Sequence, residues 1–145
     1  LELLESLPMW YKIPDTDFIC VHGGFAPAMK ELPSPHRTLN GDHATRFARS
    51  ILFTRFVNPQ GYMVPLGGDT EQDDRWADTY DGRFGTAIYG HQAYRDVKFH
   101  KHAIGTDTGC VYGNKLTAYR VSDGHLIQVD ASEAYAVPYE SEGLK

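Results

Sequence analysis

Residues 17–27 read DFICVHGGFAP, and this stretch decides how the chain folds. The run FICV is short, apolar, and made of β-branched and aromatic side chains, which predicts a buried strand. The run stops at His22, and Gly23 and Gly24 follow at once. A histidine on a glycine turn just past a buried strand projects from the rim of a sheet, where ligands of α/β folds gather. The stretch therefore predicts a sheet whose rim carries a functional histidine.

A second buried strand ends in the same way. Residues 86–91 read TAIYGH, and this run stops at Gly90 and His91. If the two strands lie side by side, His22 and His91 meet at one rim, and neutral imidazole is the commonest metal ligand near neutral pH. On spacing alone, a core or hydrogen-bonding role for both histidines is the competing interpretation. Two nitrogens also do not complete a metal site, which takes at least three protein ligands.

The remaining pattern mixes helix and strand, so the predicted fold class is α/β. Residues 43–56 have helical spacing, and residues 57–85 are rich in turn residues and read as a long loop. Residues 100–130 predict three or four strands, separated at YGNK and SDGH, that form a C-terminal β-meander. We expect one domain over residues 1–145, with residues 131–145 as a loosely held polar tail.

The bulk composition excludes several classes of partner. The net charge is −5, which argues against general nucleic-acid binding, although metal ions or a few arginines can still create a site for an anionic substrate. No apolar stretch reaches the ~20 residues that span a membrane. The two cysteines, Cys20 and Cys110, lie in apolar strand-like runs. Buried thiols fit there better than a disulfide does, so we expect a reducing, cytoplasmic location.

Three motifs carry a family resemblance. VHGGFAP, YGHQ and IGTDTGCVYGNKLTAYRV, in this order, resemble the second half of the calcineurin-like metallophosphoesterases. The similarity is greatest to the branch with the phosphoprotein phosphatases and the symmetrical diadenosine tetraphosphatases. It implies a β-sandwich of two facing sheets flanked by helices (αββα), with a mixed sheet in this half. It also implies that His22 and His91 bind a pair of divalent ions, for which manganese, iron or zinc would suit a site of nitrogen and oxygen ligands.

Three earlier motifs of that family, GDxHG, GDxxDRG and GNHE, do not occur in these 145 residues. In the family they supply the bridging aspartate, the asparagine ligand and the histidine that assists the leaving group. We therefore expect the chain to be the C-terminal half of a catalytic domain, with the N-terminal half as its missing partner. Half a sandwich leaves apolar surface in water at a cost of ~25 cal/mol per Å². We expect the chain alone to be poorly stable and inactive.

Four further residues are candidates for the site. Arg55 is predicted to bind substrate phosphate and assist catalysis, because its planar guanidinium matches phosphate oxygens; a solvated surface charge is the alternative. Trp76 and Tyr80 are predicted to form a wall for a base or an acyl group, and packing anchors are the alternative. Asp107 follows a predicted strand, where it either orients a metal-bound histidine or caps its own turn.

Two more histidines, His100 and His102, alternate along a predicted strand and so face one side of it. They suggest a metal pair, but a solvated edge strand is the interpretation that we prefer.

The resemblance implies hydrolysis of a phosphate ester or anhydride by a metal-activated water. The substrate is either a nucleoside polyphosphate, such as diadenosine tetraphosphate, or a phosphoprotein or other phosphomonoester. The Trp76 and Tyr80 loop favours a substrate that carries a base. A different class stays open, namely a non-catalytic half-domain that binds a ligand or a partner through the same rim.

Overall fold

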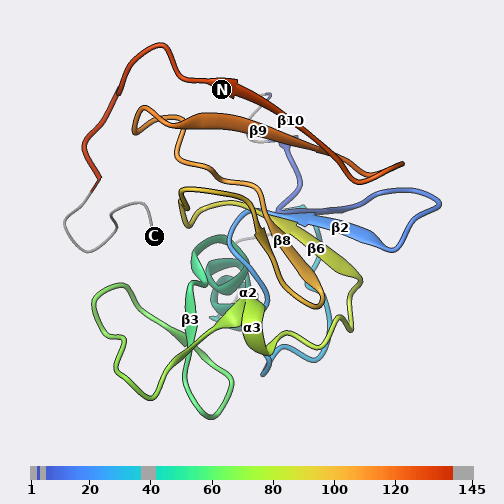
Figure 1. Ribbon diagram of the computed structural model, residues 1–145. Helices are drawn as coiled ribbons and strands as arrows, with labels where there is room; N and C mark the ends of the chain where they lie inside the picture. Colours follow the sequence, from blue (N-terminus) through green and yellow to red (C-terminus); the bar gives the residue numbers. More distant parts are fainter. Residues whose placement is uncertain (1–2, 4–5, 37–41, 139–145) are drawn as a thin grey trace.

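The computed structural model describes residues 3, 6–36 and 42–138. Its centre is a mixed five-stranded sheet with the strand order β1-β2-β6-β8-β7 (Figure 1). Strands β2, β6 and β8 run parallel to one another, and β1 and β7 pair antiparallel at the two edges. The bounds are β1 (Trp10–Lys12), β2 (Phe18–Val21), β6 (Thr86–Tyr89), β7 (Lys98–Phe99) and β8 (Ala103–Gly105).

The two strands that end in histidine are direct neighbours. β2 pairs with β6 over its whole length, and Val21 lies opposite Tyr89. The strands leave the sheet together, because the N–H of Gly90 donates to the carbonyl of His22 at 3.0 Å. Both strand predictions are confirmed, and the parallel register brings the carboxyl ends of the two strands to one rim.

One face of the sheet is covered by helices α2 (Asp42–Phe53) and α3 (Trp76–Thr79) and by a small sheet (Figure 1). The small sheet has the order β4-β3-β5, with β3 (Phe56–Val57), β4 (Met63–Val64) and β5 (Asp74–Arg75). The segment predicted as a long loop is therefore more ordered than expected. The core between these layers is continuous and holds, among others, Ile19, Val21, Phe25, Met29, Ile51, Trp76, Tyr80, Tyr89 and Tyr94.

The predicted helix ends three residues early. Thr54 turns back on the last turn of α2, where both its N–H and its hydroxyl donate to the carbonyl of Ser50, at 3.0 and 2.6 Å. The chain then enters β3. Threonine competes with the helix for its own backbone groups in this way, which favours a helix end.

The opposite face of the sheet carries a hairpin of β9 (Lys115–Arg120) and β10 (His125–Asp130) (Figure 1). The two strands form a sheet of their own, so the predicted meander is one hairpin, while β7 and β8 belong to the main sheet. The inner face of the hairpin docks through Tyr119, whose ring lies 5.9 Å from that of Phe18. Thr117 bonds to Thr108 at 2.6 Å. The α/β class with a mixed sheet is confirmed.

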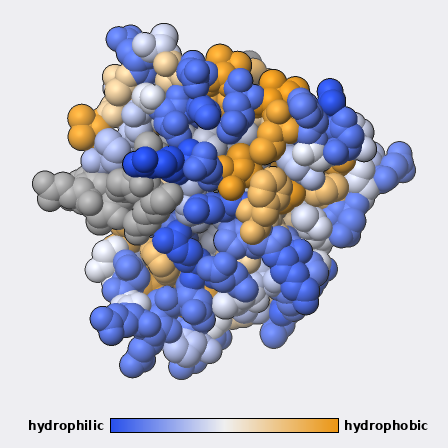
Figure 2. Space-filling model, viewed as in Figure 1, coloured by the Kyte–Doolittle hydropathy of each residue, from blue (hydrophilic) through white to orange (hydrophobic). Residues whose placement is uncertain are grey.

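The outer face of this hairpin is apolar and exposed. Leu116 lies opposite Val129, and Ala118 lies opposite Ile127, so these four side chains share one face. Leu116, Ile127 and Val129 are each about half exposed or more. Figure 2 shows apolar surface over this part of the molecule. An uncovered apolar face agrees with the expectation of an incomplete sandwich, and the N-terminal half as its cover stays a prediction.

Part of the predicted tail is held by the loop before β9. The N–H of Ala131 donates to Asn114, and the N–H groups of Tyr135 and Ala136 donate to Val111. Residues 139–145 lie outside the described residues, so a loosely held tail over residues 131–145 stays a prediction, as does the single-domain assignment. Among the described residues, none of the helices is long and apolar enough to cross a membrane.

Candidate metal and phosphate site

The side chains of His22 and His91 meet at the rim of the sheet. Their ring centroids lie 4.9 Å apart with an interplanar angle of 54°. The sequence predicted that both imidazoles would lie at one rim, and this is confirmed. The spacing would let the two rings serve the same metal pair, whose ions lie ~3.5–4 Å apart in two-metal sites.

His91 occupies a strained turn. Its φ is +69°, a left-handed value that residues with a Cβ rarely adopt. The N–H of Gln92 donates to the carbonyl of Gly90 at 2.8 Å, which closes a three-residue γ-turn with His91 at its centre. Such strain costs of order 1–3 kcal/mol and persists only where the surroundings hold it in place, and it is concentrated at functional sites.

The ring of His91 is anchored on one side and unsatisfied on the other. A hydrogen bond from the ring to the backbone carbonyl of Phe53 ties it to the end of α2, and the ring of Phe53 packs edge-on at 5.9 Å. Its Nε2 is buried and has no hydrogen-bond partner among the described residues. Burial lowers the pKa of His91 to about 4, and the charges of Arg55 and His22 act in the same direction. The imidazole is therefore neutral at physiological pH, with the Nε2 lone pair available to a metal ion.

The backbone of the two glycines after His22 is hydrogen-bonded to the carboxyl-terminal end of α2. The N–H groups of Gly23 and Gly24 both donate to the carbonyl of Ile51, at 2.9 and 3.1 Å, and so satisfy an end that lacks helical partners. A Cβ on Gly23 would lie 2.8 Å from the carbonyl group of Leu52. The negative end of the helix dipole thus lies against the two histidines and favours positive charge there.

We expect Gly24→Ala to destabilise the full-length protein by about 1–3 kcal/mol or more, the usual range for overpacking a core. A Cβ at this position would lie 2.2 Å from the indole ring of Trp76. Gly90→Ala is the matched control, because its new methyl would meet Asp107 Cβ at an ordinary 3.7 Å. Urea unfolding of both variants measures the difference, and equal losses would show that the fit around Gly24 is looser than described.

Arg55 lies directly after α2 and close to the histidines. Its carbonyl accepts from the N–H of Trp76 at 3.2 Å, which fixes its backbone to α3. Its side chain is partly buried, and its charge is near enough to lower the pKa of His91. The charge of the guanidinium therefore acts on one of the two rim imidazoles. Its contact with a phosphate group stays a prediction.

Asp107 caps its own turn. Its Oδ1 accepts from the N–H of Gly109 at 3.1 Å, which is the alternative that the sequence left open. Its Oδ2 lies 4.0 Å from the position of a Cβ built on Gly90, beside the turn of His91. Its backbone carbonyl accepts from the N–H of Tyr94 at 3.0 Å. The orientation of a metal-bound histidine by this carboxylate stays a prediction.

Trp76 and Tyr80 are core residues in this structure. They are 1% and 5% exposed, and their rings pack against each other at 5.5 Å and against Phe25 at 6.1 and 5.5 Å. The hydroxyl of Tyr80 donates to the carbonyl of Gly85 at 3.0 Å, and burial raises its pKa to about 12. The structure thus shows the packing role for both rings, and their contact with a substrate stays a prediction.

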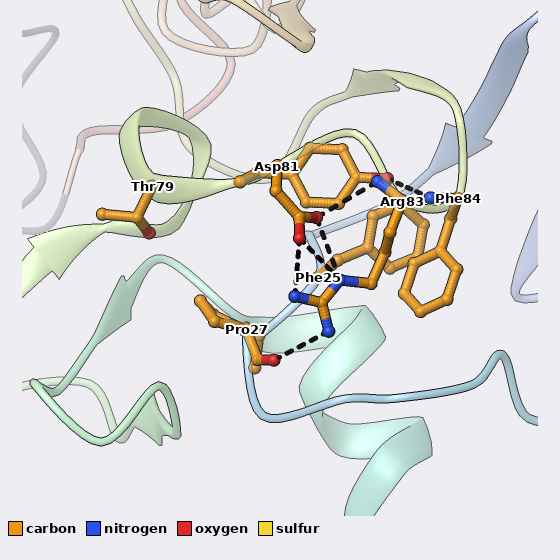
Figure 3. A pocket seen from close by; sticks show the side chains of 8 residues that line it. Phe25, Pro27, Thr79, Asp81, Arg83 and Phe84 are labelled. Carbon is orange, nitrogen blue, oxygen red and sulfur yellow. Dashed lines mark hydrogen bonds and ion pairs between the residues drawn. The ribbon is translucent and has the colours of Figure 1, made fainter.

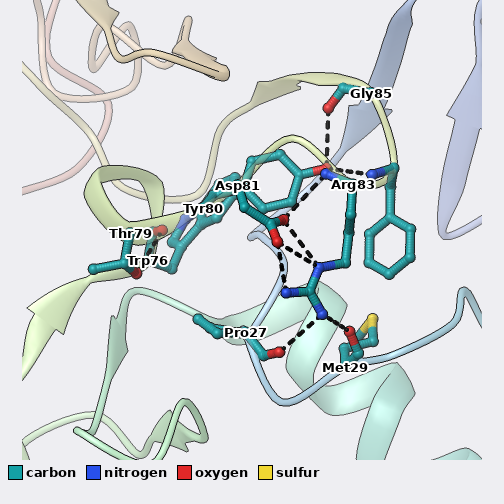
Figure 4. A network of polar contacts seen from close by, with 9 residues as sticks. Pro27, Met29, Trp76, Thr79, Tyr80, Asp81, Arg83 and Gly85 are labelled. Carbon is teal, nitrogen blue, oxygen red and sulfur yellow. Dashed lines mark hydrogen bonds and ion pairs between the residues drawn. The ribbon is translucent and has the colours of Figure 1, made fainter.

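An ion pair next to Tyr80 anchors the chain after the glycine turn. Arg83 binds both carboxylate oxygens of Asp81 and donates to the carbonyls of Pro27 and Met29 (Figure 4). The hydrogen bonds from Arg83 lower the pKa of Asp81 to about 2. The cavity between these side chains and Phe25 holds about 10 Å³, room for one water and not for a base (Figure 3).

A larger cavity of about 260 Å³ opens beside His22, lined partly by Trp10, Tyr11 and Leu52. It is much larger than the cavity at Tyr80 and lies next to the histidine rim.

His100 differs from its prediction. It was expected on a solvated edge, but its side chain is mostly buried, with Nδ1 2.8 Å from a carboxylate oxygen of Asp78 and Nε2 3.0 Å from the hydroxyl of Tyr89. This polar cluster was missed because its members come from separate elements, and the only local signal was the HKH alternation.

The described part of the chain does not by itself form a complete metal site. Among the described residues there is no group of three or more histidine, cysteine, aspartate or glutamate side chains that could hold a metal ion. The chain therefore offers two imidazoles, one with a buried, unpartnered nitrogen, and these fit a metal pair only as part of a larger ligand set.

Comparison with known proteins gives relatives of one kind. No protein-family model matches the chain. The bis(5'-nucleosyl)-tetraphosphatase PrpE of Bacillus subtilis is 29% identical over 136 residues, 93% of this chain and 49% of the relative. That of Bacillus velezensis is 26% identical over 136 residues, 93% of this chain and 48% of the relative. That of Bacillus mycoides is 30% identical over 133 residues, 91% of this chain and 47% of the relative.

A crystal structure of a protein assigned as a diadenosine tetraphosphatase shares the fold, with a TM-score of 0.63 and 24% identity over 90% of this chain and 54% of that one. The names of the relatives specify the asymmetrical type, whereas the motifs suggested the symmetrical one. The chain spans about half the length of the curated relatives that it matches. The chain is therefore similar in sequence to bacterial tetraphosphatases and in fold to a diadenosine tetraphosphatase, which supports the resemblance to the calcineurin-like metallophosphoesterases.

Proposed function

We propose that the protein containing this chain hydrolyses a phosphoanhydride bond of a dinucleoside polyphosphate in a metal-dependent reaction. The observation that carries the proposal is the histidine pair at the sheet rim, whose ring centroids lie 4.9 Å apart and in which Nε2 of His91 is buried without a partner in the described part of the chain. A buried polar atom without a hydrogen bond is costly, so an unsatisfied one needs an explanation. A metal ligand role satisfies it, and a packing role does not.

The chain's own residues prepare the rim for cations and phosphate. His91 is held neutral by burial, and its hydrogen bond to Phe53 leaves Nε2 as the free ring nitrogen. His22 is exposed beside it, and the carbonyl end of α2 lies behind both rings. When bound, two divalent ions such as manganese, iron or zinc supply a water that ionises near neutral pH and a positive clamp for phosphate oxygens.

The proposed substrate class follows the names of the relatives, which are nucleoside tetraphosphatases. The predicted wall of Trp76 and Tyr80 no longer supports it, because both rings are buried. The cavity beside His22 supports it instead, since it lies next to the rim and Trp10 and Tyr11 are among the residues that line it. A phosphoprotein substrate would instead place a peptide in this cavity. The experiment below distinguishes a nucleotide substrate from a phosphoprotein substrate.

The test is hydrolysis of diadenosine tetraphosphate by the full-length protein with manganese, followed by nucleotide chromatography. We expect turnover that stops when the metal is chelated. Equal amounts of ATP and AMP identify asymmetrical cleavage, and ADP alone identifies symmetrical cleavage. A phosphoserine peptide serves as the competing substrate, and a preference for it by kcat/KM would overturn the nucleotide assignment.

Arg55→Lys and Arg55→Ala in the full-length protein are expected to lower kcat/KM about ten- to a hundred-fold. This corresponds to one charge-assisted hydrogen bond of about 1.5–3 kcal/mol to a phosphate oxygen. Lysine keeps the charge but loses the planar fork, so it should not restore the rate. Metal content should stay normal, because a guanidinium is not a metal ligand.

Arg49→Ala is the matched control, since Arg49 is an exposed arginine on α2, the helix that precedes Arg55. Steady-state kinetics and metal analysis on the three variants show whether Arg55 binds the substrate phosphate. If both Arg55 variants match the parent, Arg55 is a surface charge and the phosphate clamp lies elsewhere.

A further inference from the structure

A row of polar side chains runs from the surface to the turn of His91. Asp78 on α3 lies 2.8 Å from His100, and His100 lies 3.0 Å from the hydroxyl of Tyr89. Tyr89 lies 3.4 Å from the hydroxyl of Tyr94, which donates to Oε1 of Gln92 at 2.9 Å. Gln92 directly follows His91. The row therefore links an exposed carboxylate to the residue that closes the strained turn.

The row has a direction. The hydroxyl of Tyr94 donates a hydrogen bond to Gln92, and the hydroxyl of Tyr89 donates one to Tyr94. Because the single proton of the Tyr89 hydroxyl is used in this way, its oxygen accepts from Nε2–H of His100. The other ring nitrogen faces a carboxylate, which only accepts. The hydroxyls of Tyr89 and Tyr94 therefore both donate in the direction of Gln92.

The two tyrosines in the middle cannot move easily. Each is 2% exposed, and a Cβ on Gly105 would lie 2.8 Å from the ring of Tyr89, which shows how closely that ring packs on β8. The ring of Tyr94 lies under Arg75 and Lys98 at 5.6 and 5.5 Å, and Arg75 also donates to its hydroxyl at 3.3 Å. Rigid, buried hydroxyls are suited to fixing a neighbouring group.

Besides the contacts of the His91 ring with Phe53 and His22, two backbone hydrogen bonds hold the turn among the described residues. The N–H of Gly90 donates to His22, and the N–H of Gln92 donates to the carbonyl of Gly90 within the turn. His91 has a φ of +69°, and a conformation of this kind relaxes unless the residues on both sides are fixed. Gln92 is the last residue of the turn, as Gly90 is the first, and its side chain is fixed by the hydrogen bond from Tyr94.

We propose that Tyr94, backed by Tyr89 and His100, is a positioning residue that holds Gln92 and thereby keeps His91 in its strained, rim-facing conformation. The inference goes beyond the proposed function, because it concerns the shape of the turn in the metal-free protein as well. It predicts that removing the hydroxyl of Tyr94 loosens the turn of His91 more than removing a buried hydroxyl elsewhere in the protein does.

Tyr94→Phe tests it, since the ring stays and only the hydroxyl is lost. The matched control is Tyr80→Phe, which also deletes a buried hydroxyl with two hydrogen bonds, to Gly85 and from Phe84, outside the row. Amide hydrogen exchange at Gln92 in the metal-free full-length protein is the first measurement. We expect exchange about five-fold faster in Tyr94→Phe, as for the loss of one hydrogen bond, and unchanged in Tyr80→Phe.

The second measurement is the affinity of the same proteins for Mn²⁺ by titration calorimetry. We expect an affinity several-fold weaker in Tyr94→Phe and unchanged in Tyr80→Phe. In a double-mutant cycle with Gln92→Leu, the two substitutions should not be additive, because they break the same hydrogen bond.

Unchanged exchange at Gln92 in Tyr94→Phe, or equal acceleration in both tyrosine variants, would overturn the positioning role. If the parent binds no Mn²⁺, the proposed metal function fails, while the exchange measurement still decides the role of Tyr94.

Discussion

His91→Ala in the full-length protein is expected to remove bound metal from the site and to lower kcat/KM for diadenosine tetraphosphate by at least about 100-fold. Loss of a residue behind a metal ligand already costs about 10–100-fold, and loss of the ligand itself should cost more. His91 presents a neutral, buried nitrogen that no other described group satisfies. His22→Ala should have the same kind of effect, because the two rings meet at one rim.

Metal content by mass spectrometry and steady-state kinetics measure both variants together. His125→Ala is the control, because His125 is an exposed histidine at the start of β10, away from the rim. Its metal content and kcat/KM should equal those of the parent. A His91→Ala protein that keeps its full metal content would return His91 to a core role, which is the alternative that spacing alone leaves open.

The 145-residue chain by itself is expected to hydrolyse no p-nitrophenyl phosphate, even with manganese added. The described residues offer two imidazoles and no larger metal-binding group, whereas a two-metal site also needs bridging carboxylates. The chain spans about half the length of its curated relatives, and the outer face of its hairpin is apolar and exposed. We therefore also expect the isolated chain to aggregate or to unfold at low denaturant concentration.

The measurement compares release of p-nitrophenol by the purified chain with that of the full-length protein at equal concentration. Turnover by the isolated chain that His22→Ala abolishes would show a complete site within these residues and would end the half-site interpretation. Residual turnover that His22→Ala leaves unchanged would come from a contaminating phosphatase, and the expectation would stand.

The sequence by itself determined the two strands, their ends and the chemistry of those ends. β2 and β6 are short apolar runs stopped by glycine turns, and this signal is local, because both the strand pattern and the turn lie within a few residues. The resemblance of the motifs then paired His22 with His91, and the relatives agree with the superfamily. The reason for Gly23, however, is the end of α2, and the reason for Gly24 is the ring of Trp76, and no local pattern reveals either.

Only the tertiary structure decided which polar and aromatic side chains are buried, and against what. The sequence left Trp76 and Tyr80 open as a substrate wall or as packing anchors, and the structure buries both rings in the core with residues of β2 and β6. His100 looks like a residue of a solvated edge, yet it bonds to Asp78 and Tyr89 from two other elements. The burial of a side chain depends on contacts between residues distant in the chain, so it can be read only from the folded structure. The alternation of side chains along a strand depends only on the residues of that strand, so it can be read from the sequence.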